Sequence, residues 1–148
     1  MKEFKQFGSY GLVIKNDTIL LIKKNGGPYD GKLDLPGGTI EFNERPQDTL
    51  KREMMEETGI EVESFILFDA DSVSFEWQFK DDLLFKVHHM GIFYRIDKYK
   101  NEVKSQIKIN EENDDSIGAC FYNISELKKD DVSRIVILEL EKLGYNLK

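Results

Sequence analysis

The first third of the chain alternates short apolar runs with turn-forming residues. Apolar runs at residues 10–14 and 18–22 are separated by Lys15-Asn16-Asp17, a spacing that predicts a β-hairpin. A glycine-rich loop follows, and a short alternating strand at residues 33–35 leads into Pro36-Gly37-Gly38. Because glycine adopts backbone angles that other residues avoid, we expect a tight and exposed backbone at this point.

A helix is predicted at residues 46–58. Pro46 suits the first turn of a helix, and Thr58-Gly59 suits its end. Leu50 and Met54 give this helix one apolar side. The segment therefore reads as an amphipathic helix with one face turned towards a core.

Three further segments have the composition of sheet strands. Residues 62–68, 73–79 and 84–94 are rich in β-branched and aromatic side chains, and Lys80-Asp81-Asp82 predicts a turn between the last two. Their aromatic residues, Trp77 among them, fit a core or an interface better than base stacking. These segments predict successive strands of one sheet.

The chain becomes polar beyond residue 99. Residues 107–109 form a weak candidate strand, residues 111–115 an acidic loop, and residues 117–122 could close the sheet. A second helix is predicted at residues 132–143, where apolar residues recur at helical spacing. Asp130 or Asp131 would cap it and Gly144 would follow its end. Two helices framing a mixed sheet indicate an α/β architecture.

Length and composition narrow the class of protein. A chain of 148 residues has the size of one domain, so we expect a single domain over residues 1–148. Hydrophobic residues at 40% and charged residues at 33% exclude the disordered and membrane classes. The net charge of −7 makes nucleic acid an unlikely partner. The only cysteine, Cys120, is expected in the core, and a cytoplasmic location is expected.

The predicted helix at residues 46–58 carries a cluster of carboxylates. Glu53, Glu56 and Glu57 stand three and four residues apart, which places them on one face within a turn. Such like charges repel unless they spread into solvent or are neutralised by a cation. Hard divalent ions take oxygen ligands, often carboxylates together with substrate phosphates. The cluster is therefore either a solvated helix face or a metal site that handles phosphate.

Neighbouring residues favour the metal site. Arg52 can pair with Glu56 one turn later and hold that carboxylate in a fixed position. Gly37-Gly38 can bring a backbone carbonyl or amide close to an ion or a phosphate. Glu41 and Glu44 add acid in the loop before the helix.

The spacing of these residues resembles a known family signature. Gly38, five residues, Glu44, seven residues, and then Arg52-Glu53-Met54-Met55-Glu56-Glu57-Thr58-Gly59-Ile60 is similar to the Nudix box. Every defining position of the box is filled over residues 38–60, and Leu35-Pro36 ahead of it also fits the family.

This resemblance implies a fold, an activity and a set of site residues. It implies an α/β/α sandwich with a mixed sheet and the Nudix loop, helix and loop, and hydrolysis of the pyrophosphate bond in a nucleoside diphosphate linked to another moiety. It implies Mg²⁺ or Mn²⁺ as cofactor. By position, Glu53, Glu56 and Glu57 would be catalytic metal ligands, the carbonyl of Gly37 or Gly38 a further ligand, Arg52 an orienting residue, and Glu44 a supporting carboxylate.

Three positions depart from the family pattern. Asn43 stands where the family often has glycine, and Arg45 occupies the helix-cap position where Ser or Thr would bond a backbone amide. Both are expected to affect the loop and not the chemistry. Leu33 replaces an aromatic residue often found near the substrate in this family.

The general base and the substrate stay open at this point. Either a box glutamate, Glu53 or Glu56, or a residue of the acidic loop, Glu112 or Asp115, could serve as base; the box glutamates already lie near the expected metal-bound water. Some members of the family that this chain resembles carry further marks after the box: a proline in ADP-ribose cleavers and a tyrosine in dinucleoside polyphosphate cleavers. Those positions fall near Phe75 and near Trp77 to Gln78, and neither mark is present, which favours a small nucleotide as substrate without naming it. The alternatives are a catalytically inactive domain that senses nucleotides, and a purely structural acidic helix. The oligomeric state is open.

Overall fold

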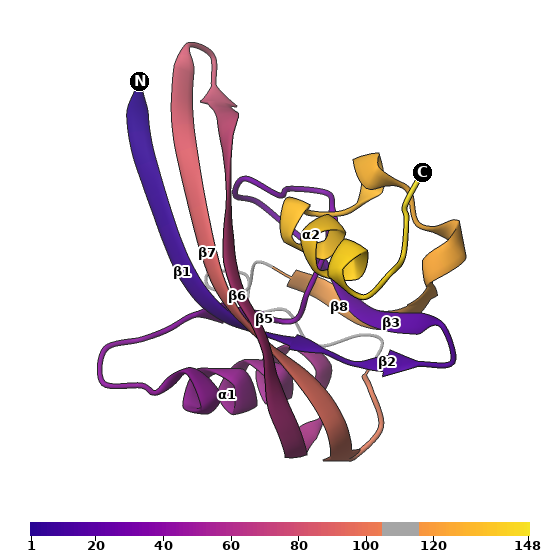
Figure 1. Ribbon diagram of the computed structural model, residues 1–148. Coiled ribbons are helices and arrows are strands. Elements are labelled where there is room, and N and C mark those ends of the chain that lie inside the picture. Colours follow the sequence, from indigo (N-terminus) through magenta and orange to yellow (C-terminus); the bar gives the residue numbers. More distant parts are fainter. Residues whose placement is uncertain (105–115) are drawn as a thin grey trace.

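Two four-stranded β-sheets lie between α1 and α2 in the computed structural model, which describes residues 1–104 and 116–148 (Figure 1). The strands are β1 (Lys2–Leu12), β2 (Ile14–Lys15), β3 (Thr18–Lys24), β4 (Leu33–Asp34), β5 (Gly37–Thr39), β6 (Glu61–Lys80), β7 (Leu83–Lys100) and β8 (Ser116–Asn123). The helices are α1 (Pro46–Thr58) and α2 (Arg134–Lys142), with 3₁₀ turns η1 (Ile124–Glu126) and η2 (Lys129–Asp131).

Parallel and antiparallel pairs occur in the same sheet. The first sheet has the order β5-β1-β7-β6, in which β1 runs parallel to β7 while β5 and β6 run antiparallel to their neighbours. In the second sheet β3 pairs with β2, β4 and β8, all antiparallel. The predicted mixed sheet and the predicted hairpin at residues 10–22 are therefore confirmed.

Strand β3 supplies side chains to two separate hydrophobic cores. Ile19 and Leu21 belong to the core that α2 covers, while Leu20 and Ile22 belong to the core that α1 covers. Successive strand residues point to opposite faces, so a strand buried on both sides reads as a continuous apolar run. This arrangement gives the layered α/β/α architecture that the resemblance implies.

Strand pairing is more extensive than the sequence pattern predicts. The segments 62–68 and 73–79 are one strand, β6, and the two-strand prediction is wrong at Asp69 to Ser72. Those polar residues are paired with β7 through positions such as Asp71 opposite Gly91, so the neighbouring strand satisfies their backbone despite their polarity. Strand β1 likewise begins at Lys2 because β7 pairs with its whole length.

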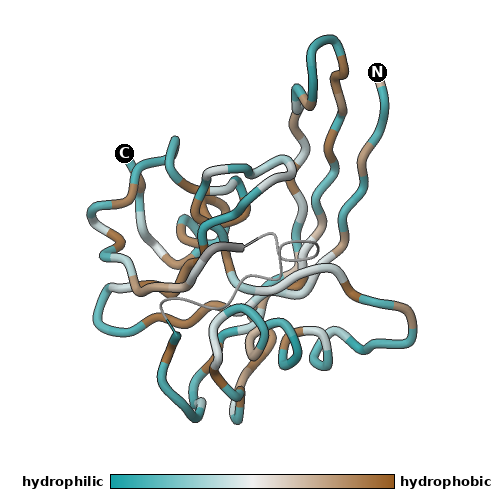
Figure 2. The backbone as a smooth tube through the Cα atoms, turned by 180° about the vertical axis from the view of Figure 1, so that it is seen from behind, coloured by the Kyte–Doolittle hydropathy of each residue, from teal (hydrophilic) through white to brown (hydrophobic). Residues whose placement is uncertain are grey.

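The ends of β1, β6 and β7 project from the body of the protein (Figure 1). This projecting part, formed by residues 2–7, 71–80 and 83–90, is called the arm below. Hydrophilic residues occupy the turn between β6 and β7 that ends the arm, as Figure 2 shows. The predicted turn at residues 80–82 is confirmed there, with Asp81 at a φ of 42°.

The start of α2 corrects one prediction. Neither Asp130 nor Asp131 caps the helix, because the chain first forms the η2 turn there. Ser133 is the cap: its Oγ accepts from the Val136 N–H at 3.4 Å and donates to Asp34 Oδ1 at 2.6 Å. A hydroxyl can satisfy a helix amide and a buried carboxylate together, which explains this choice.

Two further observations concern composition. Cys120 is exposed, so the expectation that it lies in the core is wrong. The side chain before it on β8, Ala119, is buried in a core, and successive strand residues point to opposite faces. Among the helices of the described residues, none is long and apolar enough to cross a membrane.

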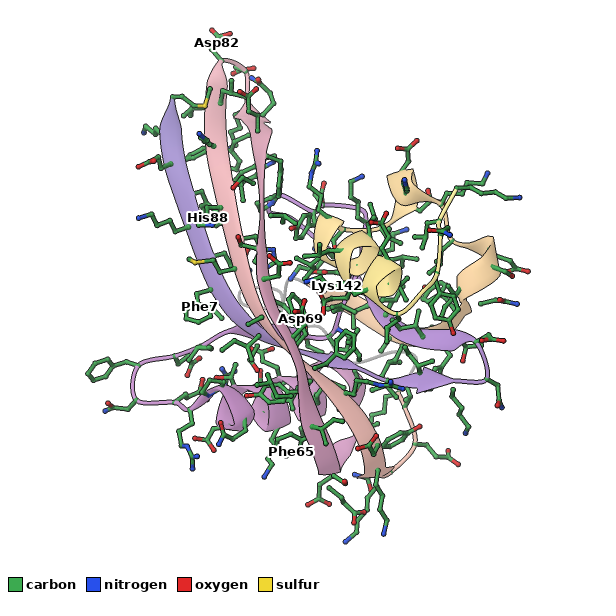
Figure 3. All side chains as sticks on the ribbon, in the orientation of Figure 1. Phe7, Phe65, Asp69, Asp82, His88 and Lys142 are labelled. Carbon is green, nitrogen blue, oxygen red and sulfur yellow. The ribbon has the colours of Figure 1, made fainter. Side chains whose placement is uncertain are left out.

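Lys142 connects α2 to β6 beside a buried carboxyl group. Glu139 is fully buried on α2, and Lys142 on the same helix contacts both Asp69 and Asp71 of β6 at 2.5 Å (Figure 3). Burial raises the pKa of Glu139 to about 9, and its interaction with the Asp69 carboxyl group contributes to the increase. Glu139 therefore keeps its proton in the folded protein at neutral pH.

We expect the replacement Glu139→Gln to stabilise the protein increasingly as pH rises. The unfolded chain releases the Glu139 proton above about pH 4.5, whereas the folded protein keeps it up to about pH 9, so wild-type stability is lost across that window. The slope is at most about 1.4 kcal/mol per pH unit. Urea unfolding of the wild type and of Glu139→Gln at about pH 5 and about pH 8 measures the difference in their free energies of unfolding. Glu141→Gln, at an exposed position of the same helix, is the control. A stability difference that is the same at both pH values would contradict a protonated Glu139.

Candidate active site

Two glycines of β5 place its backbone against β1 and α1. Gly37 has a φ of 142°, and a Cβ there would lie 2.2 Å from the Ser9 carbonyl oxygen. A Cβ on Gly38 would lie 2.7 Å from Glu53 Oε1. The tight backbone predicted for this stretch is confirmed, and the Glu53 carboxylate contacts it at Gly38. The expectation that the stretch is exposed is wrong, because Pro36 and Gly37 are buried between β1 and α1.

Glu57 joins the last turn of α1 to the same strand. Its Oε1 accepts a hydrogen bond from the Gly37 N–H at 2.7 Å, and the residue is only 7% exposed. A carboxylate held by a backbone amide has a fixed position and orientation. Glu53 and Glu57 therefore both meet β5 at the paired glycines.

Arg52 donates hydrogen bonds to three of the carboxylates around it. Its Nε and Nη2 each donate to Glu44 at 2.8 Å, a two-bond contact, while Nη1 donates to Glu53 at 2.9 Å and to Glu56 at 3.4 Å. These bonds from Arg52 are the main cause that lowers the pKa of Glu44 to about 2. The predicted contact with Glu56 is confirmed, but the stronger partner is Glu44, eight residues earlier.

The loop before α1 accounts for two departures from the family pattern. Asn43 has a φ of 70°, a conformation that glycine adopts easily and asparagine tolerates. Arg45 precedes the helix, and its backbone N–H donates to Asp48 Oδ2 at 3.1 Å. This is one of the two hydrogen bonds of a capping box, in which the N3 side chain accepts from the N-cap amide. Arg45 has no hydroxyl that could make the other bond.

A cavity of about 370 Å³ lies beside these residues and is called the carboxylate cavity below. Its lining consists of Gln6, Tyr10, Lys24, Gly37, Gly38, Thr39, Glu41, Glu53, Glu56 and Glu57. The acidic side chains come from α1 and its preceding loop, whereas Lys24 comes from the end of β3. Within residues 1–104 and 116–148, no three His, Cys, Asp or Glu side chains are gathered closely enough to hold an ion.

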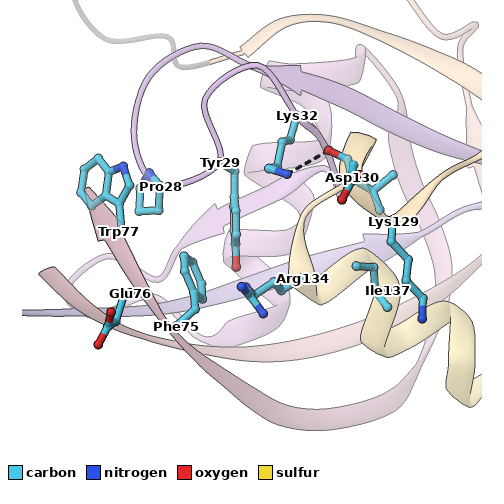
Figure 4. A pocket seen from close by; sticks show the side chains of 11 residues that line it. Pro28, Tyr29, Lys32, Phe75, Glu76, Trp77, Lys129, Asp130, Arg134 and Ile137 are labelled. Atoms are coloured by element: carbon cyan, nitrogen blue, oxygen red, sulfur yellow. Dashed lines mark hydrogen bonds between the residues drawn. The ribbon is translucent and has the colours of Figure 1, made fainter. Parts of the chain in front are cut away.

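A second cavity, of about 400 Å³, is called the aromatic cavity (Figure 4). Tyr29 stacks on Phe75 with ring centres 5.5 Å apart, and the Arg134 guanidinium lies 4.9 Å from the Phe75 ring centre. Trp77 also borders the cavity, and Lys32 donates to the Asp130 carbonyl at 2.9 Å. The lining therefore offers ring faces together with cationic groups.

Sequence reasoning found only part of this second cavity. The strand pattern indicates Phe75 and Trp77 as candidate rings, whereas it gives no indication of Tyr29 or Arg134. Tyr29 lies in the glycine-rich loop and Arg134 begins α2, so only the folded chain brings them to β6. One indication in the sequence is their position: Tyr29 lies in a loop and Arg134 at the start of a predicted helix. Side chains at such positions commonly line a binding site.

His89 lies between the two cavities. It is buried, and its Nε2 is 2.5 Å from Tyr10 Oη while its Nδ1 is 2.8 Å from Tyr29 Oη. Its neighbour His88 is partly exposed, as expected for successive strand residues, which point to opposite faces. Burial, with a further contribution from Lys24, lowers the pKa of His89 to about 4. The imidazole is therefore neutral at physiological pH.

The acidic loop at residues 111–115 and the weak strand at residues 107–109 lie outside the described residues. The expected roles of Glu112 and Asp115 therefore stay predictions.

Comparisons with known proteins identify a matching family model, two similar curated proteins and a similar solved structure. The family model "NUDIX domain" matches residues 6–140. An ADP-ribose pyrophosphatase of Methanocaldococcus jannaschii is 29% identical over 119 residues, which are 80% of this chain and 62% of that protein. The nucleoside triphosphatase NudI of Salmonella typhimurium is 37% identical over 82 residues, which are 53% of each. The crystal structure of a MutT NUDIX hydrolase from Burkholderia pseudomallei matches with a TM-score of 0.73 at 21% identity, covering 95% of this chain and 98% of that one.

These matches differ in what they support. The matched part of this chain spans 62% and 53% of the lengths of the two curated relatives. At 21% identity, the likeness to the crystal structure supports the fold alone.

Proposed function

Because the chain belongs to the NUDIX family, we propose that it is a divalent-metal-dependent hydrolase of the pyrophosphate bond in a nucleoside diphosphate linked to another moiety. The observation that carries this proposal is the contact of Glu53 and Glu57 with the glycines of β5, beside a cavity that Glu56 also borders. All three carboxylates and the β5 backbone offer oxygen atoms, the donors that Mg²⁺ and Mn²⁺ prefer.

The proposed ligands fit such an ion in the chemistry of their oxygen atoms. Since no three acidic side chains of the described residues are gathered closely enough to hold an ion, the carboxylates would have to move together around it. Glu53, Glu56 and Glu57 would bind it, with the carbonyl of Gly37 or Gly38 as a further ligand. Arg52 now contacts two of these carboxylates, so it would orient them and limit their repulsion before an ion arrives. A bound ion would neutralise the diphosphate and lower the pKa of a water molecule. As general base we propose a box glutamate, Glu53 or Glu56.

The aromatic cavity supports binding of the nucleoside part. The rings of Phe75 and Trp77 offer faces for a planar base, and Arg134 offers positive charge for an anionic group. We favour a nucleoside triphosphate, cleaved to its monophosphate and diphosphate, as the substrate. The proposal includes a cytoplasmic location and excludes nucleic acid as the main partner, because the net charge is −7.

A panel of nucleotides tests this proposal. Nucleoside triphosphates, nucleotide sugars, ADP-ribose and dinucleoside polyphosphates are incubated with the protein in Mg²⁺, in Mn²⁺ and in chelator, and the products are separated by chromatography. We expect cleavage of at least one compound with either ion and none in chelator. Binding of a compound without cleavage in either ion would overturn the enzyme and favour a nucleotide sensor. Cleavage that persists in chelator would overturn the metal requirement.

A further inference from the structure

A continuous chain of hydrogen bonds runs through the protein between the two cavities. It passes from Tyr10 on β1 through His89 on β7 to Tyr29 in the loop after β3, with distances of 2.5 Å and 2.8 Å. All three residues are at most 5% exposed. Tyr10 lines the carboxylate cavity, and Tyr29 lines the aromatic cavity.

Three protons belong to this chain, and two of them are used within it. A neutral imidazole carries one N–H and one bare nitrogen, so it donates one hydrogen bond and accepts one. Each tyrosine hydroxyl can do either. The tyrosine that accepts a hydrogen bond from the His89 N–H keeps its own hydroxyl proton for another acceptor. The other tyrosine donates its hydroxyl proton to the bare nitrogen of the ring.

The charge states support this count. A tyrosine hydroxyl carries its proton at neutral pH, and burial raises the pKa of Tyr29 further. His89 stays neutral, as described above. The chain therefore has two arrangements of equal charge, which differ only in which ring nitrogen carries the proton.

We propose that His89 is a positioning residue that couples the two cavities, because its tautomer decides whether Tyr10 or Tyr29 has a hydroxyl proton to donate. This inference rests on the proposed function of the site. With the proton on Nδ1, Tyr29 can donate to a ligand in the aromatic cavity while Tyr10 presents only lone pairs. With the proton on Nε2, the roles are reversed.

The change between the arrangements balances. The Tyr10 proton moves to Nε2, and the Nδ1 proton moves to the Tyr29 oxygen. Tyr10 takes up one proton from its surroundings and Tyr29 releases one. The chain holds three protons before and after, and no group changes its charge. A ligand that accepts a hydrogen bond from Tyr29 favours the arrangement with the proton on Nδ1. In that arrangement Tyr10 donates to His89 and can only accept from other groups, so a donor such as a water molecule is favoured next to it.

Nitrogen chemical shifts of His89 test the inference directly. The full chain is labelled with ¹⁵N-histidine, and His88→Gln assigns the two rings. Because a buried donor without a partner is costly, Tyr29→Phe should shift the ring towards Nε2–H and Tyr10→Phe towards Nδ1–H. Adenosine, as a probe of the aromatic cavity, and inorganic diphosphate with Mg²⁺, as a probe of the carboxylate cavity, should each change the tautomer ratio.

Two outcomes separate the inference from the proposed function. If Mg²⁺-diphosphate binds and nucleotides are cleaved while the His89 tautomer is the same in all samples, the coupling is overturned and the hydrolase stands. If Mg²⁺-diphosphate does not bind and no nucleotide is cleaved, both are overturned. Opposite tautomers in the two phenylalanine variants together with a ligand-dependent ratio support the coupling.

Kinetics provide a second readout that a purely structural role would not move. The hydroxyls of Tyr10 and Tyr29 each contact His89, so their effects on kcat/KM should be non-additive by about twofold or more in a double-mutant cycle. Repeating the cycle in His89→Phe should make the effects additive. In His89→Gln the amide offers an NH2 donor group and a carbonyl acceptor that can exchange places by rotation, so part of the coupling should return. Additive effects in the wild-type background would overturn the inference.

Discussion

Glu57→Gln should lower kcat/KM for the nucleotide that the protein cleaves by about 10³-fold and leave the fold intact. A glutamine keeps the oxygen that accepts from the Gly37 N–H, so the junction between α1 and β5 survives. It removes the negative charge that the proposed ion needs. Several kcal/mol of charge stabilisation would be lost, and ~1.4 kcal/mol corresponds to tenfold in rate.

Steady-state kinetics at saturating Mg²⁺ measure this effect, and thermal unfolding checks the fold. Glu63→Gln is a matched control, because Glu63 is an exposed glutamate on β6, away from both cavities. Its kcat/KM should equal that of the wild type. Full activity of Glu57→Gln in a folded protein would remove Glu57 from the proposed ligands.

Alanine substitutions at the two glycines of β5 should have different effects. Gly37→Ala tests whether the close packing of β5 on β1 is needed for stability, and Gly38→Ala tests whether the position of Glu53 is needed for activity. Gly37→Ala should destabilise the protein by about 3 kcal/mol or more, because its Cβ would meet the Ser9 carbonyl and its φ of 142° disfavours a side chain. Gly38→Ala meets only the end of the flexible Glu53 side chain, so its stability should change by less than about 1 kcal/mol. Displacing Glu53 should nevertheless lower activity by about 10–100-fold.

Urea unfolding and kinetics on both variants measure these effects. The informative result is a folded Gly38→Ala protein with low activity beside an unstable Gly37→Ala protein. Equal stability of the two variants would mean that the approach of β5 to β1 is looser than the structure shows. Wild-type activity of Gly38→Ala would mean that the position of Glu53 is not important for turnover.

Local features of the fold were predictable because their causes are local. The helix at residues 46–58 starts at a proline and ends before a glycine, and its predicted bounds agree with α1. The alignment of Glu53, Glu56 and Glu57 follows from helical spacing alone. The contact between Arg52 and Glu44 depends on how the preceding loop folds back, which spacing does not determine.

The second cavity could not be predicted because it forms between distant segments. Tyr29, Phe75 and Arg134 come from three different parts of the chain, and no spacing rule connects them. His89 shows the same limit. Its sequence neighbours indicate a strand, whereas its role depends on tyrosines that lie 79 and 60 residues away.

Pairing between strands also exceeded what the pattern predicts. The polar run from Asp69 to Ser72 looks like a break when residues are read singly, since Asp and Ser favour turns. Strand β7 overrides that preference by pairing with each residue from Asp69 to Ser72, although the register shifts between Leu67 and Asp69.

The arm leaves one side of β1 open to solvent. Over residues 2–7, β1 pairs with β7, and among the described strands β5 joins its other side only from Gly8 onwards. An open strand edge is a template on which another chain can add a strand and start a polymer. Lys2, Glu3 and Lys5 place charges along this edge, and burying them against a neighbour would carry a desolvation cost. These charges therefore oppose the addition of a further strand at this edge of β1.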